Sequence, residues 1–187
     1  MKIPCFLCLA LVLLPGLAGA QSTAAGSSSA VVPAATPAAA SIAVLGDVLH
    51  PGVFTISDLQ KLAPPETVHA SLKGETHDWT GIRLSALLTA AGLKVEAEAK
   101  HPETRFIVLA RGRDGYLAAF SYAELLPEAE KEPVYLAWAV DRQPLSANEG
   151  PFRLVAPGEK LVRRVYNLGN LEVYDGAKWK AAALIEQ

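Results

Sequence analysis

Cysteine is almost absent from this sequence. Its 187 residues include two cysteines, Cys5 and Cys8, and both lie in an apolar segment at the N-terminus. If that segment is removed as a leader, the remaining chain has no disulfide, no thiol nucleophile and no thiolate ligand for a metal. The C-x-x-C spacing is known from redox and metal sites, but we expect no such role inside a leader. The hydrophobic core alone must therefore stabilise the fold.

An excess of basic charge is also lacking. Lysine and arginine together number 17, aspartate and glutamate 19, and the net charge is −2. Without a basic stripe to follow a phosphate backbone, we expect no nucleic-acid partner. The sequence also lacks a Ser-His-Asp spacing, a nucleophile elbow and a glycine-rich phosphate loop. The usual signatures of serine hydrolases and nucleotide-binding proteins are therefore missing.

The apolar run at the N-terminus is too short to span a membrane. It has about ten residues, from Cys5 to Leu14, whereas a hydrocarbon core needs about twenty. Lys2 precedes the run, and Ala18-Gly19-Ala20 supplies the small residues that a signal peptidase requires. We predict that residues 1–20 are a signal peptide and that the protein is periplasmic or secreted. No membrane span is expected after cleavage.

Bulky residues are scarce in the next segment. Residues 21–41 consist almost entirely of Ala, Ser, Thr, Gly and Pro. Such a segment buries too little apolar surface to offset the entropy of ordering it. We predict a disordered linker over 21–41 and one folded domain over 42–187.

Beyond the linker, the hydrophobic pattern predicts many short strands and few helices. Strands are expected at 42–45, 68–72, 76–79, 106–110, 116–120, 134–140, 152–156 and 162–173, the last with a bulge or turn at Gly169-Asn170. A capping box at residues 55–58 starts a short helix that ends before Pro64. A second helix covers 84–91, and a second capping box at 121–124 predicts another. Because strands and helices do not alternate regularly, we predict an α+β fold.

Four sequence blocks then carry a family resemblance. They are Asp78-Trp79-Thr80-Gly81-Ile82-Arg83-Leu84, Gly112-Arg113-Asp114-Gly115-Tyr116, the stretch from Leu136-Ala137 to Pro144-Leu145, and Gly150-Pro151-Phe152-Arg153-Leu154-Val155 with Pro157-Gly158. In this order and at this spacing they resemble the oxidoreductase molybdopterin-binding domain family. The resemblance covers roughly residues 42–175. It implies the mixed sheets and few short helices of the sulfite-oxidase fold, with molybdopterin as the expected cofactor of the catalytic members.

Two departures from the family pattern affect the implied chemistry. Catalytic members ligate molybdenum through a cysteine in the stretch before the Trp-x-Gly block, but residues 67–74 of this chain contain none. The family commonly has a Lys-Trp pair after the arginine that matches Arg163, and Tyr166-Asn167 stands there instead. Molybdenum favours a soft thiolate ligand. We therefore expect no thiolate-ligated molybdenum, while molybdopterin itself remains a candidate cofactor.

Six residues are candidates for binding the cofactor or another ligand. They are Arg153, Arg163, Arg164, His69, Trp79 and Gly81. Arg153 stands in an apolar strand, where a guanidinium needs an anionic or carbonyl partner. That partner is either a ligand or an internal carboxylate or backbone group. Trp79 is also explained as a core residue, and Gly81 as a glycine that lets the chain turn sharply into the helix.

The histidines near the missing cysteine suggest a sharper hypothesis. His69 and His77 approach each other if the chain turns at Lys73-Gly74, and with Asp78 they would form a metal site. The simpler interpretation is that both histidines line a solvated face of a hairpin. We therefore assign no metal ligand from the sequence.

Three functions follow from these observations. The first, which we favour, is an exported sulfite-oxidase-fold module that binds a pterin-like or other small anionic ligand, or a periplasmic protein partner, without sulfite-oxidase turnover. The second is a molybdopterin-dependent oxidoreductase whose metal is held by the pterin dithiolene only. The third is a structural or interaction domain with no cofactor.

Overall fold

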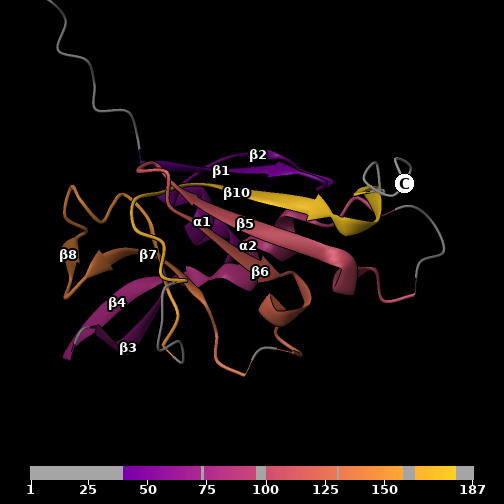
Figure 1. The fold of residues 1–187 in the computed structure, drawn as a ribbon. Coiled ribbons are helices and arrows are strands. Elements are labelled where there is room, and N and C mark those ends of the chain that lie inside the picture. The colour runs from indigo at the N-terminus through magenta and orange to yellow at the C-terminus, as the bar shows by residue number, and fades with distance from the viewer. Residues whose placement is uncertain (1–39, 73, 96–99, 130, 158–162, 180–187) are drawn as a thin grey trace, which may run out of the picture. The chain divides into compact units, whose positions relative to one another are not determined.

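The computed structural model describes residues 40–72, 74–95, 100–129, 131–157 and 163–179. The predicted signal peptide and nearly all of the predicted linker lie outside the described residues. The described chain folds into two five-stranded sheets with two α-helices, which confirms the α+β class. Figure 1 shows the arrangement of these elements.

The first sheet joins strands from both ends of the described chain. Its order is β2-β1-β10-β5-β6. The strands are β1 (Ser41–Gly46), β2 (Gly52–Thr55), β5 (Phe106–Gly112), β6 (Leu117–Ser121) and β10 (Leu168–Asp175). β1 and β10 run parallel, and the other neighbouring strands are antiparallel.

The second sheet carries the candidate site. Its order is β3-β4-β7-β8, and β9 also pairs with β7. The strands are β3 (Glu66–Leu72), β4 (Glu75–Arg83), β7 (Tyr135–Val140), β8 (Gln143–Pro144) and β9 (Arg153–Val155). All pairs in this sheet are antiparallel.

Among the described residues, two α-helices and three 3₁₀ turns accompany the two sheets. α1 (Ile56–Leu62) starts at the predicted capping box, in which Thr55 and Asp58 satisfy each other's backbone N–H groups. α2 (Leu84–Ala91) ends at Gly92, as predicted, with φ of 61°. The 3₁₀ turns are η1 (Pro102–Arg105), η2 (Ala123–Leu125) and η3 (Gly176–Lys178). No helix among the described residues is long and apolar enough to cross a membrane.

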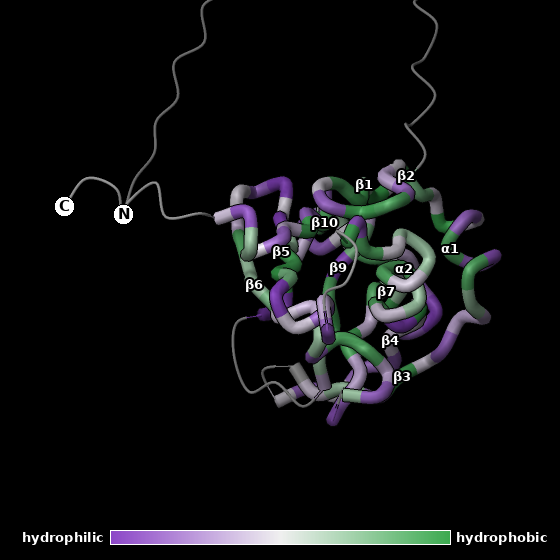
Figure 2. The backbone as a smooth tube through the Cα atoms, turned by 90° about the vertical axis from the view of Figure 1, so that its right-hand side faces the viewer, coloured by the Kyte–Doolittle hydropathy of each residue, from purple (hydrophilic) through white to green (hydrophobic). Residues whose placement is uncertain are grey.

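The main core combines residues of both sheets with α2. Alternate residues of the strands enter it, including Val108 of β5, Leu136 of β7 and Leu154 of β9. Hydrophobic stretches gather in the interior in Figure 2. A smaller cluster, formed by Ala70, Trp79, Tyr135, Ala137 and Val155, takes the alternate positions of the second sheet. That second face is where the candidate site lies.

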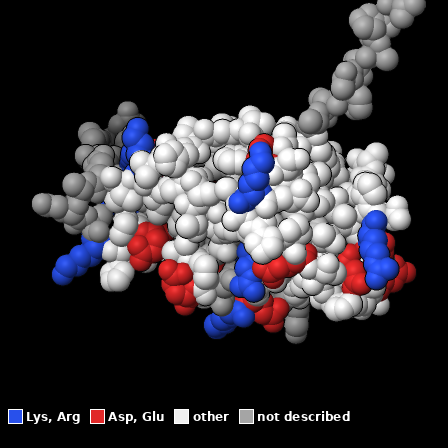
Figure 3. Space-filling view, turned by 180° about the vertical axis from the view of Figure 1, so that it is seen from behind, with Lys and Arg blue, Asp and Glu red and all other residues white. Residues whose placement is uncertain are grey.

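Charged side chains of both signs are interspersed at the surface. On the face shown in Figure 3, acidic and basic groups lie next to one another rather than in a stripe of one sign. The pairing of Arg111 with Glu172, with Nε 2.9 Å from Oε1, is one example.

Three predictions of secondary structure need correction. β2 was not predicted, because its four residues pair only with β1 and lack a pattern of their own. The last strand begins at Leu168 rather than near residue 162, although the predicted irregularity at Gly169-Asn170 is present. The second capping box is only half formed. Glu124 accepts from the Ser121 N–H, but the short turn η2 begins after Tyr122 with no side-chain cap.

Candidate functional site

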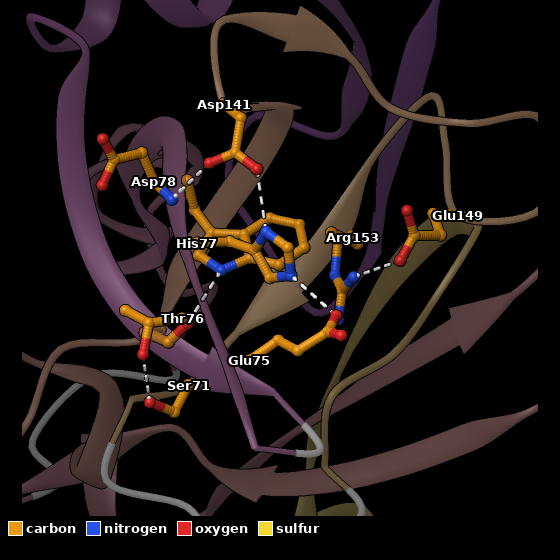
Figure 4. Close-up of polar contacts among 10 residues, drawn as sticks. Ser71, Glu75, Thr76, His77, Asp78, Asp141, Glu149 and Arg153 are labelled. Carbon is orange, nitrogen blue, oxygen red and sulfur yellow. Dashed lines mark hydrogen bonds and ion pairs between the residues drawn. The ribbon is translucent and has the colours of Figure 1, made fainter.

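A cavity of about 420 Å³ lies beside the second sheet. Its lining residues are Glu75, His77, Trp79, Val140, Asp141, Glu149 and Tyr166. Glu75, His77 and Trp79 alternate along β4, so their side chains share one face of that strand. The other lining residues come from the end of β7, the turn after it, and the segments on either side of β9. Figure 4 shows the polar groups of this region.

Arg153 is buried against the wall of this cavity. It pairs with Ala137 across β7 and β9, while Gly81 of β4 pairs with the same alanine. Leu154 enters the main core, so the side chain of Arg153 points to the opposite face of β9, where Trp79 lies. The guanidinium carbon lies 4.1 Å from the ring centre of Trp79 and 4.2 Å from that of Tyr166. The two aromatic rings therefore hold the guanidinium by cation–π contacts.

The hydrogen bonding of Arg153 is incomplete. Its Nη1 donates to Oε1 of Glu149 at 2.7 Å. Its Nε and Nη2 have no hydrogen-bond partner among the described residues, although the side chain is 0% exposed. Burial lowers the pKa of the guanidinium, while the nearby Tyr166 and Glu149 raise it. Leaving a buried donor unpaired costs about 1–3 kcal/mol, and more for a charged group. The unpaired N–H groups are therefore the strongest sign of a ligand site.

His77 and Asp141 form an ordered pair at the cavity. Nδ1 of His77 lies 2.8 Å from Oδ2 of Asp141, and the imidazole packs edge-on to Trp79 with ring centres 5.8 Å apart. The hydrogen bond to Asp141 raises the pKa of His77 above its usual 6.5. The pKa of Asp141 is lowered, first by the backbone N–H of Asp78 and then by His77. Each group of the pair thus favours the charged form of the other.

The structure brings together some of the six candidate residues and separates others. Trp79 and Arg153 are in contact. Arg164 is close enough that its charge lowers the pKa of Arg153. Arg163 lies at a different cavity of about 470 Å³, where its guanidinium covers the ring of Phe120 and Nη1 lies 2.6 Å from Oε1 of Glu124. Arg153 and Arg163 therefore do not line one pocket.

The two histidines of the hairpin do not meet. In the register of β3 and β4, His69 is opposite Asp78 and Ala70 is opposite His77. Neighbouring positions of a strand point to opposite faces, so His69 and His77 face away from each other. The hypothesis that they form a metal site together is therefore wrong. His69 pairs with Asp78 instead, Nδ1 to Oδ1 at 2.5 Å, and its side chain is 77% exposed.

Gly81 is required by packing rather than by a turn. It remains within β4, where the pairing with β7 shifts register between Thr80 and Gly81. A Cβ at this position would lie 2.1 Å from the carbonyl oxygen of Leu136. The close approach of β4 and β7 explains the glycine, and the predicted sharp turn is not the reason.

Sequence reasoning did not identify Asp141, Glu149 or Tyr166 as site residues. In the sequence Asp141 falls inside the third family block without a role of its own, and Tyr166 stands out only because it replaces the lysine of the family's Lys-Trp pair. Glu149 could have been suggested by its spacing, since it precedes the buried Arg153 by four residues. Its contact depends on the path of the chain from the turn after β8 into β9, which no local pattern predicts.

Comparisons with known proteins agree with this fold. The model of the oxidoreductase molybdopterin-binding domain family matches residues 29–181. Among solved structures, the chain is similar to the sulfane dehydrogenase SoxCD from Paracoccus pantotrophus, with 25% sequence identity and a TM-score of 0.55. That match covers 73% of this chain and 38% of the SoxCD chain. A comparison with curated proteins found no significant match. On the family match, this chain belongs to the oxidoreductase molybdopterin-binding domain family.

Proposed function

We propose that this protein binds a small pterin-like ligand in the cavity beside Arg153 and does not itself carry out sulfite-oxidase turnover. The observation that carries the proposal is the buried guanidinium of Arg153 with two N–H-bearing nitrogens unpaired among the described residues. A ligand that supplies acceptor atoms there removes the cost of leaving them unpaired.

The surroundings of Arg153 support binding of a flat ligand. Trp79, Tyr166 and Glu149 all contact Arg153 and also line the cavity. A ligand in the cavity therefore contacts the residues that surround the guanidinium. The aromatic rings provide an apolar wall for a heterocycle.

The donor set does not fit a thiolate-bound molybdenum centre. No cysteine follows Cys8 in the sequence, and the polar lining of the cavity consists of carboxylates, a histidine and a tyrosine hydroxyl. Molybdenum in this fold would need a soft ligand that these residues do not supply. This supports a binding role without sulfite-oxidase turnover.

The first experiment measures what the protein carries. The full chain is purified from a host that makes molybdenum cofactor in molybdenum-replete medium, and bound pterin and molybdenum are quantified. We expect bound pterin without stoichiometric molybdenum. Stoichiometric molybdenum would instead support an oxidoreductase with the metal held by the dithiolene. Absence of both, together with no thermal shift by 6-hydroxymethylpterin, would support a structural or interaction domain.

A variant pair then tests Arg153 itself. Arg153→Lys keeps the charge but removes the planar fork, and we expect affinity for 6-hydroxymethylpterin to fall at least about tenfold. Arg111→Lys is the control, because Arg111 pairs with Glu172 on β10 and does not line the cavity. Equal loss of affinity in both variants, measured by calorimetry, would contradict the role of Arg153.

A further inference from the structure

We propose that the ion pair of Arg163 with Glu124 shields the outer edge of β6, and that without this pair the chain associates with a second copy of itself through that edge. The inference goes beyond the proposed function, since neither residue is among the described residues that line the cavity beside Arg153. It gives Arg163 a role other than the cofactor binding expected from the sequence.

β6 is an edge strand of the first sheet. The strand order ends at β6, whose partner among the described strands is β5. Figure 2 shows β6 at one side of the fold, next to β5. An edge strand presents backbone N–H and C=O groups to which the strand of another chain can add, and proteins therefore cover or interrupt such edges.

The pairing with β5 shows which backbone groups of β6 point outward. The Tyr122 N–H donates to the Phe106 carbonyl oxygen, and the Gly112 N–H donates to the Tyr116 carbonyl oxygen. Along an antiparallel pair, residues that bond the neighbouring strand alternate with residues that do not. The residues whose backbone groups point away from β5 are therefore Leu117, Ala119 and Ser121.

The ion pair occupies two of these outward groups. Glu124 lies in η2, directly after β6, and its Oε1 accepts from the Ser121 N–H at 3.0 Å. Nη1 of Arg163 donates to the same oxygen at 2.6 Å and to the Ala119 carbonyl oxygen at 3.4 Å. The guanidinium carbon also lies 4.5 Å from the ring centre of Phe120. The two side chains thus take acceptor and donor positions that an added strand would need.

The side chains of the edge do not themselves oppose association. Leu117 is 45% exposed and Ala119 is also exposed, whereas Ala118 and Phe120 between and beside them enter the core. The outward-facing positions carry neither a charge nor proline, which are the residues that usually prevent pairing at an edge. Shielding therefore depends on Glu124 and Arg163.

A second copy of the chain fits this edge. Two copies related by a two-fold axis pair their β6 strands in antiparallel orientation. In the register that pairs all three outward-facing residues, Leu117 faces Ser121 and Ala119 faces its own copy. These residues are uncharged, so no like charges oppose one another in the pair. For this reason we infer a second copy as the partner.

The test removes the ion pair and measures the mass of the full chain by sedimentation over a concentration series. We expect the wild type to be monomeric. The double variant Glu124→Ala, Arg163→Ala should approach about twice the monomer mass as concentration rises. Lys61→Ala is the control, because it breaks an exposed ion pair with Asp58 on α1, which packs against β2 at the opposite edge of the sheet. It should remain monomeric.

A further variant locates the contact. Ala119→Lys, added to the double variant, changes an exposed side chain and leaves the monomer intact, but it places two lysines opposite each other in the expected dimer. We expect this variant to be monomeric. Thermal melting verifies that each variant is folded. If the double variant does not fold, Arg163→Gln replaces it, since this change leaves Glu124 in place and should give the same association at higher concentration.

The alternative outcomes each contradict part of the proposal. A folded variant without the ion pair that stays monomeric would overturn the shielding role. Dimers that persist with Ala119→Lys would overturn β6 as the interface. Equal association of Lys61→Ala would show that the effect is not specific to this edge, and dimers of the wild type that Ala119→Lys abolishes would show that the edge is not shielded. Ligand binding is measured separately, so none of these results decides the proposed function.

Discussion

The backbone of Arg142 lies in the left-handed region, which is unfavourable for a residue with a side chain. With Asp141 it forms the two-residue turn between β7 and β8, with φ of 48° at Asp141 and 64° at Arg142. Such turns favour glycine, because a side chain in the left-handed region costs about 1–2 kcal/mol. We predict that Arg142→Gly raises the free energy of unfolding by about 0.5–1 kcal/mol, since glycine also loses more chain entropy on folding. Denaturant unfolding measures the change.

The preceding position of the same turn is the control. Asp141→Gly relieves the same kind of strain but removes the carboxylate that bonds His77 and the Asp78 N–H. We expect this variant to be less stable than the wild type. A gain of stability in both variants would mean that the side-chain contacts of Asp141 contribute little.

His77 is predicted to titrate above its usual range. Its pKa is raised from 6.5, first by the hydrogen bond with Asp141. Because the folded pKa exceeds the unfolded value, the stability from this pair is fully present below about pH 6.5 and is lost as pH rises through the folded pKa. Asp141→Asn should move the pKa of His77 down toward 6.5, as measured by NMR titration of the imidazole. An unchanged titration in the variant would show that Asp141 is not the cause.

At the scale of elements, the contact of β4 with β7 depends on Gly81. A Cβ there would meet the backbone oxygen of Leu136, which cannot move without separating the strands. We predict that Gly81→Ala lowers the free energy of unfolding by about 3 kcal/mol. Gly52→Ala in β2 is the matched control, since its Cβ would meet only ordinary contacts with the Phe54 ring. It should change stability by less than about 0.5 kcal/mol.

Elements set by local chemistry could be predicted from the sequence. The start of α1 follows from Thr55 and Asp58, whose capping contacts span three residues. β2 could not be predicted, because its four residues become a strand only by pairing with β1. The capping box expected at Ser121 failed in part for the same reason. The chain there leaves β6, and Tyr122 is buried with its hydroxyl on the carbonyl of Leu88, a contact distant in sequence.

At the scale of the whole molecule, export is a prediction from the sequence. If residues 1–20 are a signal peptide, the mature chain expressed in a bacterium begins at Gln21 and is recovered from the periplasm. Mass spectrometry of the intact protein measures the cleavage point. Ala20→Glu should block cleavage by removing a small residue from the recognition site. A full-length chain in the cytoplasm of wild-type cells would contradict the prediction.

The sequence by itself determined the fold class, the capped helix, the family resemblance and the lack of any cysteine after Cys8. Each of these depends on residue type, on periodicity or on short spacings. Such features do not depend on which distant segments the chain contacts. Only the tertiary structure decided that Arg153 lies between Trp79 and Tyr166, that Glu149 pairs with it, and that Arg163 belongs to another cavity. These contacts depend on strand register, which fixes the face to which each side chain points. The register itself is set only by pairing between distant segments of the chain.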